Sequence, residues 1–153
     1  GGSTAVVGIL YQGSLYYASV GDSFLYLLRD GVLLKLNAEH NLLHQKYLEA
    51  IQSGDLDPLP YQTLPDAAAL TAFLGMMGLD QVDCSVSPLP IDGGDVLLAC
   101  SDGVGSVLSP EEIAEALQKP TAEEMCADLE EKIASYNRLN QDNYTAIVIK
   151  CVL

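Results

Sequence analysis

The amino-acid sequence predicts an α+β domain whose sheets are mostly antiparallel. The first observation is that apolar and β-branched segments, separated by turn dipeptides, fill the first 36 residues, as hairpins do. The second is a pair of capped helices that start at Ser109 and Thr121. The third is a last apolar strand, over residues 143–153, that follows those helices. Strands and helices grouped in this way favour an α+β sandwich.

The first 36 residues predict an antiparallel meander of four strands. Gln12-Gly13 separates the first two segments, and Asp30-Gly31 separates the last two. Asp-Gly is typical of the type I′ turn that joins two strands of a hairpin. The four expected strands are 4–10, 14–20, 23–29 and 32–36.

The period of the apolar residues then changes from that of a strand to that of a helix. Over residues 41–53 the apolar side chains recur at helical spacing, and Gly54 is placed to cap the C-terminus. A Pro-rich loop follows over 55–66, and residues 66–74 are expected to start a short helix. Alternation predicts a strand over 83–88, and a continuous apolar run predicts another over 95–101.

The two helices near the end of the chain have clear start signals. Ser109 with Glu112 forms a capping box, as does Thr121 with Glu124. In the second helix, three apolar residues recur every four positions and predict one buried stripe: Met125, Leu129 and Ile133. We see no internal repeat and no linker, so we expect residues 1–153 to form a single domain.

Composition excludes several classes of protein. About half of the residues are hydrophobic, 49%, which excludes a disordered chain. The formal net charge is −14, and the seven Lys and Arg residues are scattered along the sequence. Without a basic patch, binding to nucleic acid and to an anionic membrane surface is disfavoured. An acidic chain that handles phosphate would need metal ions to offset its own charge.

The four cysteines favour a reducing compartment. None of them forms a C-x-x-C pair, so a zinc ribbon is disfavoured. Buried free thiols are the favoured interpretation over disulfides. The chain shows no secretory signal and no apolar run long enough to span a bilayer. We therefore expect a cytoplasmic protein.

Three aspartates share a position where a strand meets a loop. Asp22 follows strand 14–20, Asp102 follows strand 95–101, and Asp142 precedes the last strand. If these strand ends converge, the carboxylates gather at one edge of a sheet, where they would suit Mg²⁺ or Mn²⁺. Asp-Gly and Gly-Asp are also ordinary turn dipeptides, and for each residue alone a turn remains the simpler interpretation.

The order of six motifs along the chain distinguishes the metal-site interpretation from that of ordinary turns. They are GSTAVVGIL, LYYASVGDSFLYLLRDG, LNAEHNLL, LTAFLG, GGDVLLACSDGV and DNYTAIVI. Their order resembles that of the metal-dependent protein Ser/Thr phosphatases of type 2C. The usual family versions are G-T-T-A, V-G-D-S-R-x-Y-L-x-R-D-G, L-T-x-D-H, L-T-x-x-L-G, G-D-x-L-L-L-C-S-D-G-L and D-N-x-T.

The resemblance implies a β-sandwich flanked by helices, with a two-metal site at one end. By this match Asp102 and Asp142 ligate the same catalytic metal, Mn²⁺ or Mg²⁺, and Asp22 lies near a third, looser metal. Metal-activated water would attack the phosphorus of phosphoserine or phosphothreonine on a protein substrate. No side-chain nucleophile is needed. The supporting residues of these motifs are Gly21, Gly103 and Asn143.

The sequence departs from the family pattern in three places. Phe24 replaces the arginine of G-D-S-R, and Ser106 replaces an aspartate that contributes to the third metal site. The N-terminal part of the usual domain is also absent. In the family that part carries a metal-bridging aspartate in D-G-x-G and an arginine that grips phosphate. We expect the missing half to be another chain, or to have been lost by cleavage or truncation.

These departures leave an alternative open. The chain is either the C-terminal part of a phosphatase, which can be inactive alone, or a non-catalytic regulatory or binding module with a degenerate phosphatase fold. An unrelated acidic interaction domain would require all six matches to be chance. His40 and His44 stand four residues apart, as in zinc-binding pairs. The sequence E-H-N-L-L-H is not H-E-x-x-H, however, and the resemblance assigns His40 to a structural turn.

Overall fold

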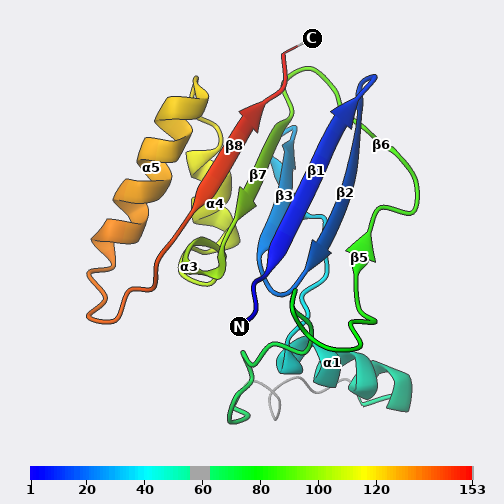
Figure 1. Cartoon of the computed structure of the whole chain (residues 1–153). Coiled ribbons are helices and arrows are strands. Elements are labelled where there is room, and N and C mark those ends of the chain that lie inside the picture. Colours follow the sequence, from blue (N-terminus) through cyan, green and yellow to red (C-terminus); the bar gives the residue numbers. More distant parts are fainter. Residues whose placement is uncertain (56–62, 153) are drawn as a thin grey trace.

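The chain forms two antiparallel sheets packed face to face, with helices on the outer side of one sheet (Figure 1). The computed structural model describes residues 1–55 and 63–152, so part of the predicted Pro-rich loop lies outside the described residues. This architecture confirms the predicted α+β antiparallel sandwich. The first sheet contains β1 (Ala5–Tyr11), β2 (Ser14–Val20), β5 (Asp83–Cys84) and β6 (Leu89–Pro90). The second has the order β4 (Val32–Lys35), β3 (Phe24–Arg29), β7 (Val96–Cys100), β8 (Ala146–Lys150).

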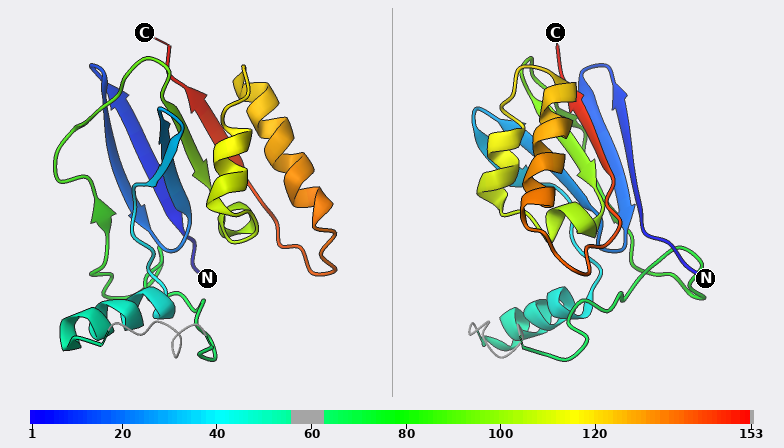
Figure 2. Two further views of the ribbon diagram at one scale, coloured as in Figure 1. Left: turned by 180° about the vertical axis from the view of Figure 1, so that it is seen from behind. Right: turned by 90° about the vertical axis from the view of Figure 1, so that its left-hand side faces the viewer.

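The predicted four-strand meander is divided between the two sheets. β1 pairs with β2 and β3 pairs with β4, as expected, but β2 and β3 lie in different sheets. The chain crosses over at Gly21, whose φ of 98° lies in the left-handed region that glycine adopts without a steric penalty. Figure 2 shows the two sheets separated in the side view. The meander prediction was therefore wrong at this one connection, because a single glycine redirected the strand.

Alternate side chains of the strands fill two separate cores. Between the sheets lies a cluster of buried residues: Leu15, Leu25, Leu27, Ile91 and Leu97. The opposite face of β3 and β7 packs against α4 (Pro110–Ala116) and α5 (Ala122–Ser135). Leu98 and Ile113 are fully buried there. β7 therefore contributes to both cores, as a central strand with two buried faces does.

The capped helices form as the sequence predicts. Both capping boxes are present, with the side chains of Ser109 and Thr121 accepting hydrogen bonds from the backbone N–H groups of Glu112 and Glu124. The predicted stripe of α5 is buried between the helices and the sheet: Met125, Leu129 and Ile133. A further short helix, α3 (Asp102–Gly105), follows β7 directly and was not predicted.

Helix α1 (Leu42–Ser53) also has the predicted caps. The Asn41 side chain accepts a hydrogen bond from the His44 N–H, and Gly54 ends the helix with a φ of 80°. Its apolar side is not covered by the described residues, because Leu48 is 47% exposed and Ile51 is 61% exposed. Only Ala50 of this helix is buried.

Two predictions in the middle of the chain need correction. Residues 66–74 form turns and isolated bridges rather than a helix. The carbonyls of Ala69 and Ala67 accept hydrogen bonds from the first N–H groups of α1, at Leu42 and Leu43. This segment therefore caps another helix instead of forming its own. The predicted strand over 83–88 is reduced to the two residues of β5, with β6 beginning only at Leu89.

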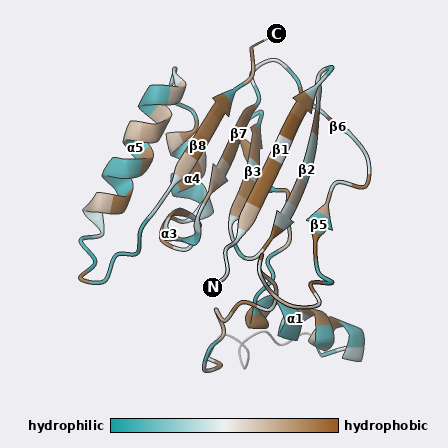
Figure 3. Ribbon diagram, in the orientation of Figure 1, coloured by the Kyte–Doolittle hydropathy of each residue, from teal (hydrophilic) through white to brown (hydrophobic). Residues whose placement is uncertain are grey.

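The sandwich is open along its β1 and β8 edges. Ile147 and Ile149 are paired with residues whose side chains point between the sheets, yet they are 60% and 42% exposed. On β1, Val7 and Ile9 are 55% and 59% exposed, and no described helix covers that face. Figure 3 shows both strands as largely hydrophobic. Exposed apolar strands of this kind mark an interaction surface.

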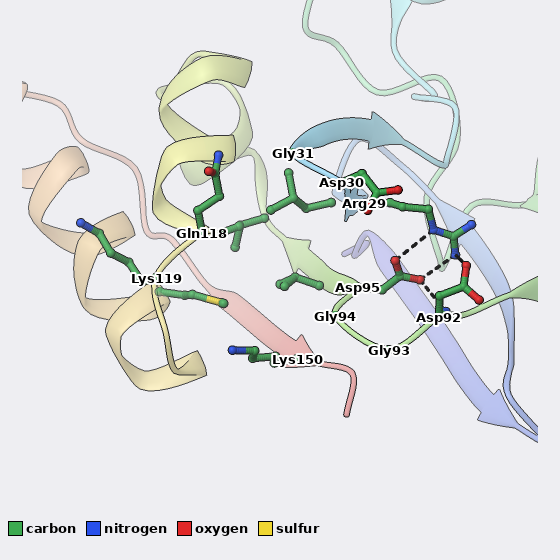
Figure 4. Close-up of a pocket in the computed structure, with 14 residues that line it drawn as sticks. Arg29, Asp30, Gly31, Asp92, Gly93, Gly94, Asp95, Gln118, Lys119 and Lys150 are labelled. Carbon is green, nitrogen blue, oxygen red and sulfur yellow. Dashed lines mark hydrogen bonds and ion pairs between the residues drawn. The ribbon is translucent and has the colours of Figure 1, made fainter. Parts of the chain in front are cut away.

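One partly buried ion pair connects β3 to the loop that leads into β7. Arg29 donates to Asp95 through Nε, at 2.9 Å, and through Nη2, at 2.6 Å (Figure 4). The Asp95 side chain is only 2% exposed and also accepts from the backbone N–H of Asp92. This side-chain hydrogen bonding from Arg29 holds the pKa of Asp95 below its usual value.

Asp95→Asn should lower the free energy of unfolding by about 2–4 kcal/mol at neutral pH, because Arg29 would lose the buried carboxylate that it pairs with at 2.6 Å. The Asp95 pKa is depressed in the folded state. The contribution of the Asp95 carboxylate to stability is therefore fully present above its pKa in the unfolded chain, about 3.9. It is lost as the pH falls through its pKa in the folded protein. Urea unfolding at stepped pH tests both points. Asp92→Asn is the control, since Asp92 is 73% exposed and 3.5 Å from Arg29, and it should change stability little. A gap between wild type and Asp95→Asn that stays constant into acid would contradict this account.

Candidate metal centre

The register of the second sheet places the three predicted aspartates beyond one edge. Phe24 is paired with Cys100, and Cys100 is paired with Ala146. Asp22 precedes β3, Asp102 follows β7 and Asp142 precedes β8. Since neighbouring strands are antiparallel, all three residues emerge from the same end of the sheet.

Two hydrogen bonds between Ser101 and Thr145 draw the ends of β7 and β8 together. The Ser101 N–H donates to the Thr145 carbonyl, and the Thr145 N–H donates to Ser101 Oγ, each at 3.0 Å. Beyond this pair, Asp102 and Asp142 line one small hollow of about 140 Å³. One oxygen of each carboxylate accepts from the next backbone N–H, at Gly103 and Asn143. The second oxygen of each has no protein partner among the described residues.

Gly103 is required at this point for a reason that the sequence did not reveal. Asp-Gly is an ordinary turn dipeptide, but Gly103 lies inside α3 and has no positive φ. A Cβ at this position would lie 2.4 Å from the carbonyl oxygen of Asn143. The glycine therefore permits a close approach of two backbone segments, and this approach brings Asp102 beside Asp142.

The loop that carries Asp22 is fixed on both sides. The Gly21 N–H donates to His40 Nδ1 at 3.0 Å, and the His40 N–H donates back to the Gly21 carbonyl at 2.8 Å. A Cβ at Gly21 would also clash with Thr4, 2.4 Å away. Burial, and next the Asp102 carboxylate, raises the pKa of Asp22 above its usual value. The two carboxylates therefore repel one another.

His40 has the structural role that the resemblance implied. It precedes α1, while His44 lies in the first turn of that helix, so the two do not share a helix face. Burial lowers the pKa of His40, in keeping with a neutral ring whose Nδ1 accepts from Gly21.

The donors at the edge suit a hard divalent cation but do not complete a site. Carboxylate oxygens are the ligands that Mg²⁺ and Mn²⁺ prefer. Gln141 Oε1 is buried beside them and accepts no hydrogen bond in the described part of the chain. Within the described residues, however, no three His, Cys, Asp or Glu side chains are grouped closely enough to hold a metal. The donors therefore fit part of a metal site.

Two residues of the hollow were missed in the sequence. Arg138 and Gln141 line it together with both carboxylates. The Arg138 guanidinium lies 5.6 Å from the centre of the Tyr136 ring and is paired with no carboxylate of the described residues. One signal was available: basic residues are rare in this chain, and Arg138 stands four positions before Asp142.

The two substitutions noted against the family pattern have different consequences. Phe24 is 6% exposed and stacks on Tyr26, with ring centres 5.7 Å apart. It packs under α3, because a Cβ at Gly105 would meet its ring at 2.4 Å. Phe24 therefore supports the site from the core and cannot contact phosphate. Ser106 ends α3 and lines the hollow without a carboxylate.

Known proteins of similar sequence are serine/threonine phosphatases. The chain is 33% identical over 150 residues to the serine/threonine phosphatase stp of Listeria monocytogenes, covering 97% of this chain and 56% of that protein. It is 26% identical to the protein phosphatase PhpP of Streptococcus pneumoniae, over 97% of this chain and 57% of that protein. The chain thus spans just over half the length of these curated relatives. No protein-family model matches it.

Solved structures show the same fold. The serine/threonine phosphatase of S. agalactiae superposes with a TM-score of 0.81 at 26% identity, over 97% of this chain and 59% of that one. The phosphatase PstP/Ppp of Mycobacterium tuberculosis gives 0.76 at 27% identity, over 96% of this chain and 59% of that one. A structure of the PstP catalytic domain, which contains 2 manganese ions, gives 0.70 at 24% identity and supports the fold alone.

Gly103→Ala should lower the free energy of unfolding by about 2–3 kcal/mol, since the new Cβ would overlap the Asn143 carbonyl. Alanine is the better helix former by about 1 kcal/mol, so a loss must come from this contact. Urea unfolding measures it. Ser106→Ala, an exposed change at the end of the same helix, is the control and should be nearly neutral. A neutral Gly103→Ala would show that the two segments are not held together.

Proposed function

Because the chain is related over nearly its whole length to the type 2C Ser/Thr phosphatases, and corresponds to the C-terminal portion of their domain, we propose that it supplies part of a metal-dependent catalytic centre. The reaction is hydrolysis of phosphoserine and phosphothreonine on proteins. The observation that carries this proposal is the emergence of Asp22, Asp102 and Asp142 from one end of one sheet. Phosphatase names among the relatives support the reaction class.

In this proposal Asp102 and Asp142 hold one Mn²⁺ or Mg²⁺ ion through their free carboxylate oxygens. Asp22 lies toward the position of the third, looser metal, where a cation would relieve its repulsion with Asp102. Gly21, Gly103 and Asn143 keep the carboxylates in place. A bound divalent cation supplies Lewis-acid stabilisation of the phosphate and a reactive water at neutral pH.

Two other residues of the hollow, Gln141 and Arg138, can bind and orient groups at the metal site. Gln141 Oε1 is an acceptor for a water molecule or another donor at the site, since its amide N–H donates to the backbone of Gly103 and Asp142. Arg138 presents the only guanidinium among the residues of the hollow. No side-chain nucleophile is needed for direct attack by water.

We further propose that residues 1–153 are one incomplete phosphatase-like domain, which additional polypeptide completes. The open β1 and β8 edges leave Ile147 and Ile149 exposed although they point between the sheets. The metal donors are incomplete at the neighbouring end. A strand-forming segment, from a longer form of this chain or from a second chain, would cover these edges and add the missing ligand.

A second candidate function follows from the same incompleteness. Phe24 and Ser106 remove a cation and a carboxylate from the family pattern, and the described residues form no complete metal cluster. A non-catalytic regulatory or binding module with a degenerate phosphatase fold would retain the sheet without the chemistry. The retained pair Asp102 and Asp142 favours the enzyme, because a binding module has no need for two carboxylates in one hollow.

The setting that we propose is the cytoplasm. All four cysteines are free thiols, and burial raises the pKa of Cys100 to about 12, which keeps that thiol unreactive. In the described ranges no helix has the length and apolarity needed to cross a membrane. The partner class is a phosphorylated protein, with neither nucleic acid nor membrane.

Mn²⁺ binding to the chain should weaken about tenfold or more in Asp102→Asn and in Asp142→Asn, because each removes one charged ligand of the same ion. Electron paramagnetic resonance of free Mn²⁺ measures this without any activity. Glu130→Gln, an exposed change on α5, is the charge-matched control. Equal binding in all four proteins would exclude these carboxylates as ligands.

Activity is best tested in a chimera. The part of the L. monocytogenes phosphatase that this chain does not match would precede Gly1, and hydrolysis of a phosphothreonine peptide would be measured with Mn²⁺. We expect activity in the chimera, little in the chain alone, and a loss of about 100-fold or more in Asp102→Asn and Asp142→Asn. A folded chimera that binds Mn²⁺ yet hydrolyses nothing would favour the non-catalytic module.

A further inference from the structure

A second and larger hollow lies at the other end of the same sheet. It has a volume of about 470 Å³ and lies between the β3–β4 turn, the loop before β7, the connection from α4 to α5, and the end of β8 (Figure 4). Its volume is within the range of small-molecule sites, about 300–1,000 Å³. The carboxylates of the candidate metal centre lie at the opposite ends of β3, β7 and β8. The proposed function does not use this hollow.

The floor of the hollow is formed by apolar side chains of the core. Leu28 and Val96 reach it from the sheet, and Leu117 and Met125 reach it from the helices. These four side chains belong to the main core and are between 1% and 5% exposed. A ligand on this floor would contact side chains that are already packed in the core, so its binding would not require rearrangement of the protein.

One wall of the hollow carries negative charge. Asp30 and Asp92 line it beside the ion pair of Arg29 with Asp95. Arg29 is committed to Asp95 at 2.6 Å and also donates to the Pro90 carbonyl at 2.8 Å. In the described part of the chain, Asp30 has no ion-pair partner, and Asp92 is 73% exposed, 3.5 Å from Arg29. This wall therefore presents carboxylates with acceptor capacity to spare.

The facing wall carries positive charge. Figure 4 shows Gln118, Lys119 and Lys150 on the side away from Asp30 and Asp92. Lys150 Nζ donates to the Pro120 carbonyl, and Lys119 Nζ lies 3.5 Å from Asp128. An ammonium group has three N–H donors, so both lysines keep donors for a ligand. The Gln118 side-chain amide N–H donates to the Ala114 carbonyl.

We propose that this hollow binds a small zwitterion with an apolar body, of which an apolar amino acid or dipeptide is the simplest form. Its carboxylate would face Lys119 and Lys150, its ammonium would face Asp30 and Asp92, and its apolar part would lie on the floor. The order of charges across the hollow selects this class. A simple anion would meet the two aspartates, and a simple cation would meet the two lysines, so each would leave one wall unpaired.

Phenylalanine and its two blocked forms test the proposal with one side chain and three charge states. Phenylalanine is zwitterionic, N-acetylphenylalanine is anionic and phenylalanine amide is cationic. Backbone amide NMR titrations would follow Gly31, Gly93 and Gly94 at the rim. We expect saturable shifts there with phenylalanine and binding at least fivefold weaker for either blocked form, the loss expected for one partly exposed charge pair.

Three variants locate the site. Asp30→Asn removes a charge and keeps the turn, because asparagine tolerates the positive φ of 49° at this position. Lys150→Gln removes one cation, with thermal unfolding to confirm that the fold is retained. Each should weaken phenylalanine binding about threefold to tenfold. Lys46→Gln, on α1, is the control and should not change it.

Several results would overturn the proposal. A blocked form that binds as well as phenylalanine would show that only one wall is used. Shifts at Ile147 and Ile149 instead of the rim would show adsorption to the open edge, and no saturation would show no site. The readout requires no phosphatase activity. The proposed function can therefore fail while this site is confirmed, and this site can fail while the proposed function is confirmed.

Discussion

Strand β7 is the constraint on which the rest of this structure depends. It lies between β3 and β8, with Leu98 buried against the helices and Leu97 buried between the sheets. A slip of one residue would exchange these two faces and expose both cores, so burial on both sides specifies the register. Asp102 follows the end of β7 by two residues, and the same register therefore brings it beside the segment that carries Asp142.

Charge is arranged differently at the two ends of these strands. At one end, Asp95 is buried and its charge is balanced by Arg29, which stabilises the fold. At the other end, Asp22 and Asp102 repel one another, and burial adds to the cost of charging Asp22. A chain of net charge −14 thus concentrates uncompensated carboxylates at one edge. Such an edge attracts cations, which is the property that a metal-dependent reaction on phosphate requires.

The open sheet edges and the partial set of metal donors are consistent with a single cause. Ile149 points between the sheets, but among the described residues no strand lies beyond β8 to cover it. The hollow of Asp102 and Asp142 lies at the start of the same strand. A polypeptide that covered this edge would pass close to the carboxylates. The relatives that this chain matches are longer, since the chain spans 56% of the phosphatase from L. monocytogenes. Additional polypeptide, as in those relatives, would both cover the sheet edge and supply metal donors.

The sequence by itself determined most of the local elements, and the tertiary structure decided how they meet. Capping boxes at Ser109 and Thr121 were readable because their partners lie three residues away, and the aspartates at strand ends were readable by motif. The crossover at Gly21 and the close contact of Gly103 with the Asn143 carbonyl were not readable. The presence of Arg138 in the hollow was signalled only by the rarity of basic residues and its position four residues before Asp142. Each depends on backbone segments that are distant in sequence, and their contact follows from sheet register and from the burial of both faces of β7, which no local pattern encodes.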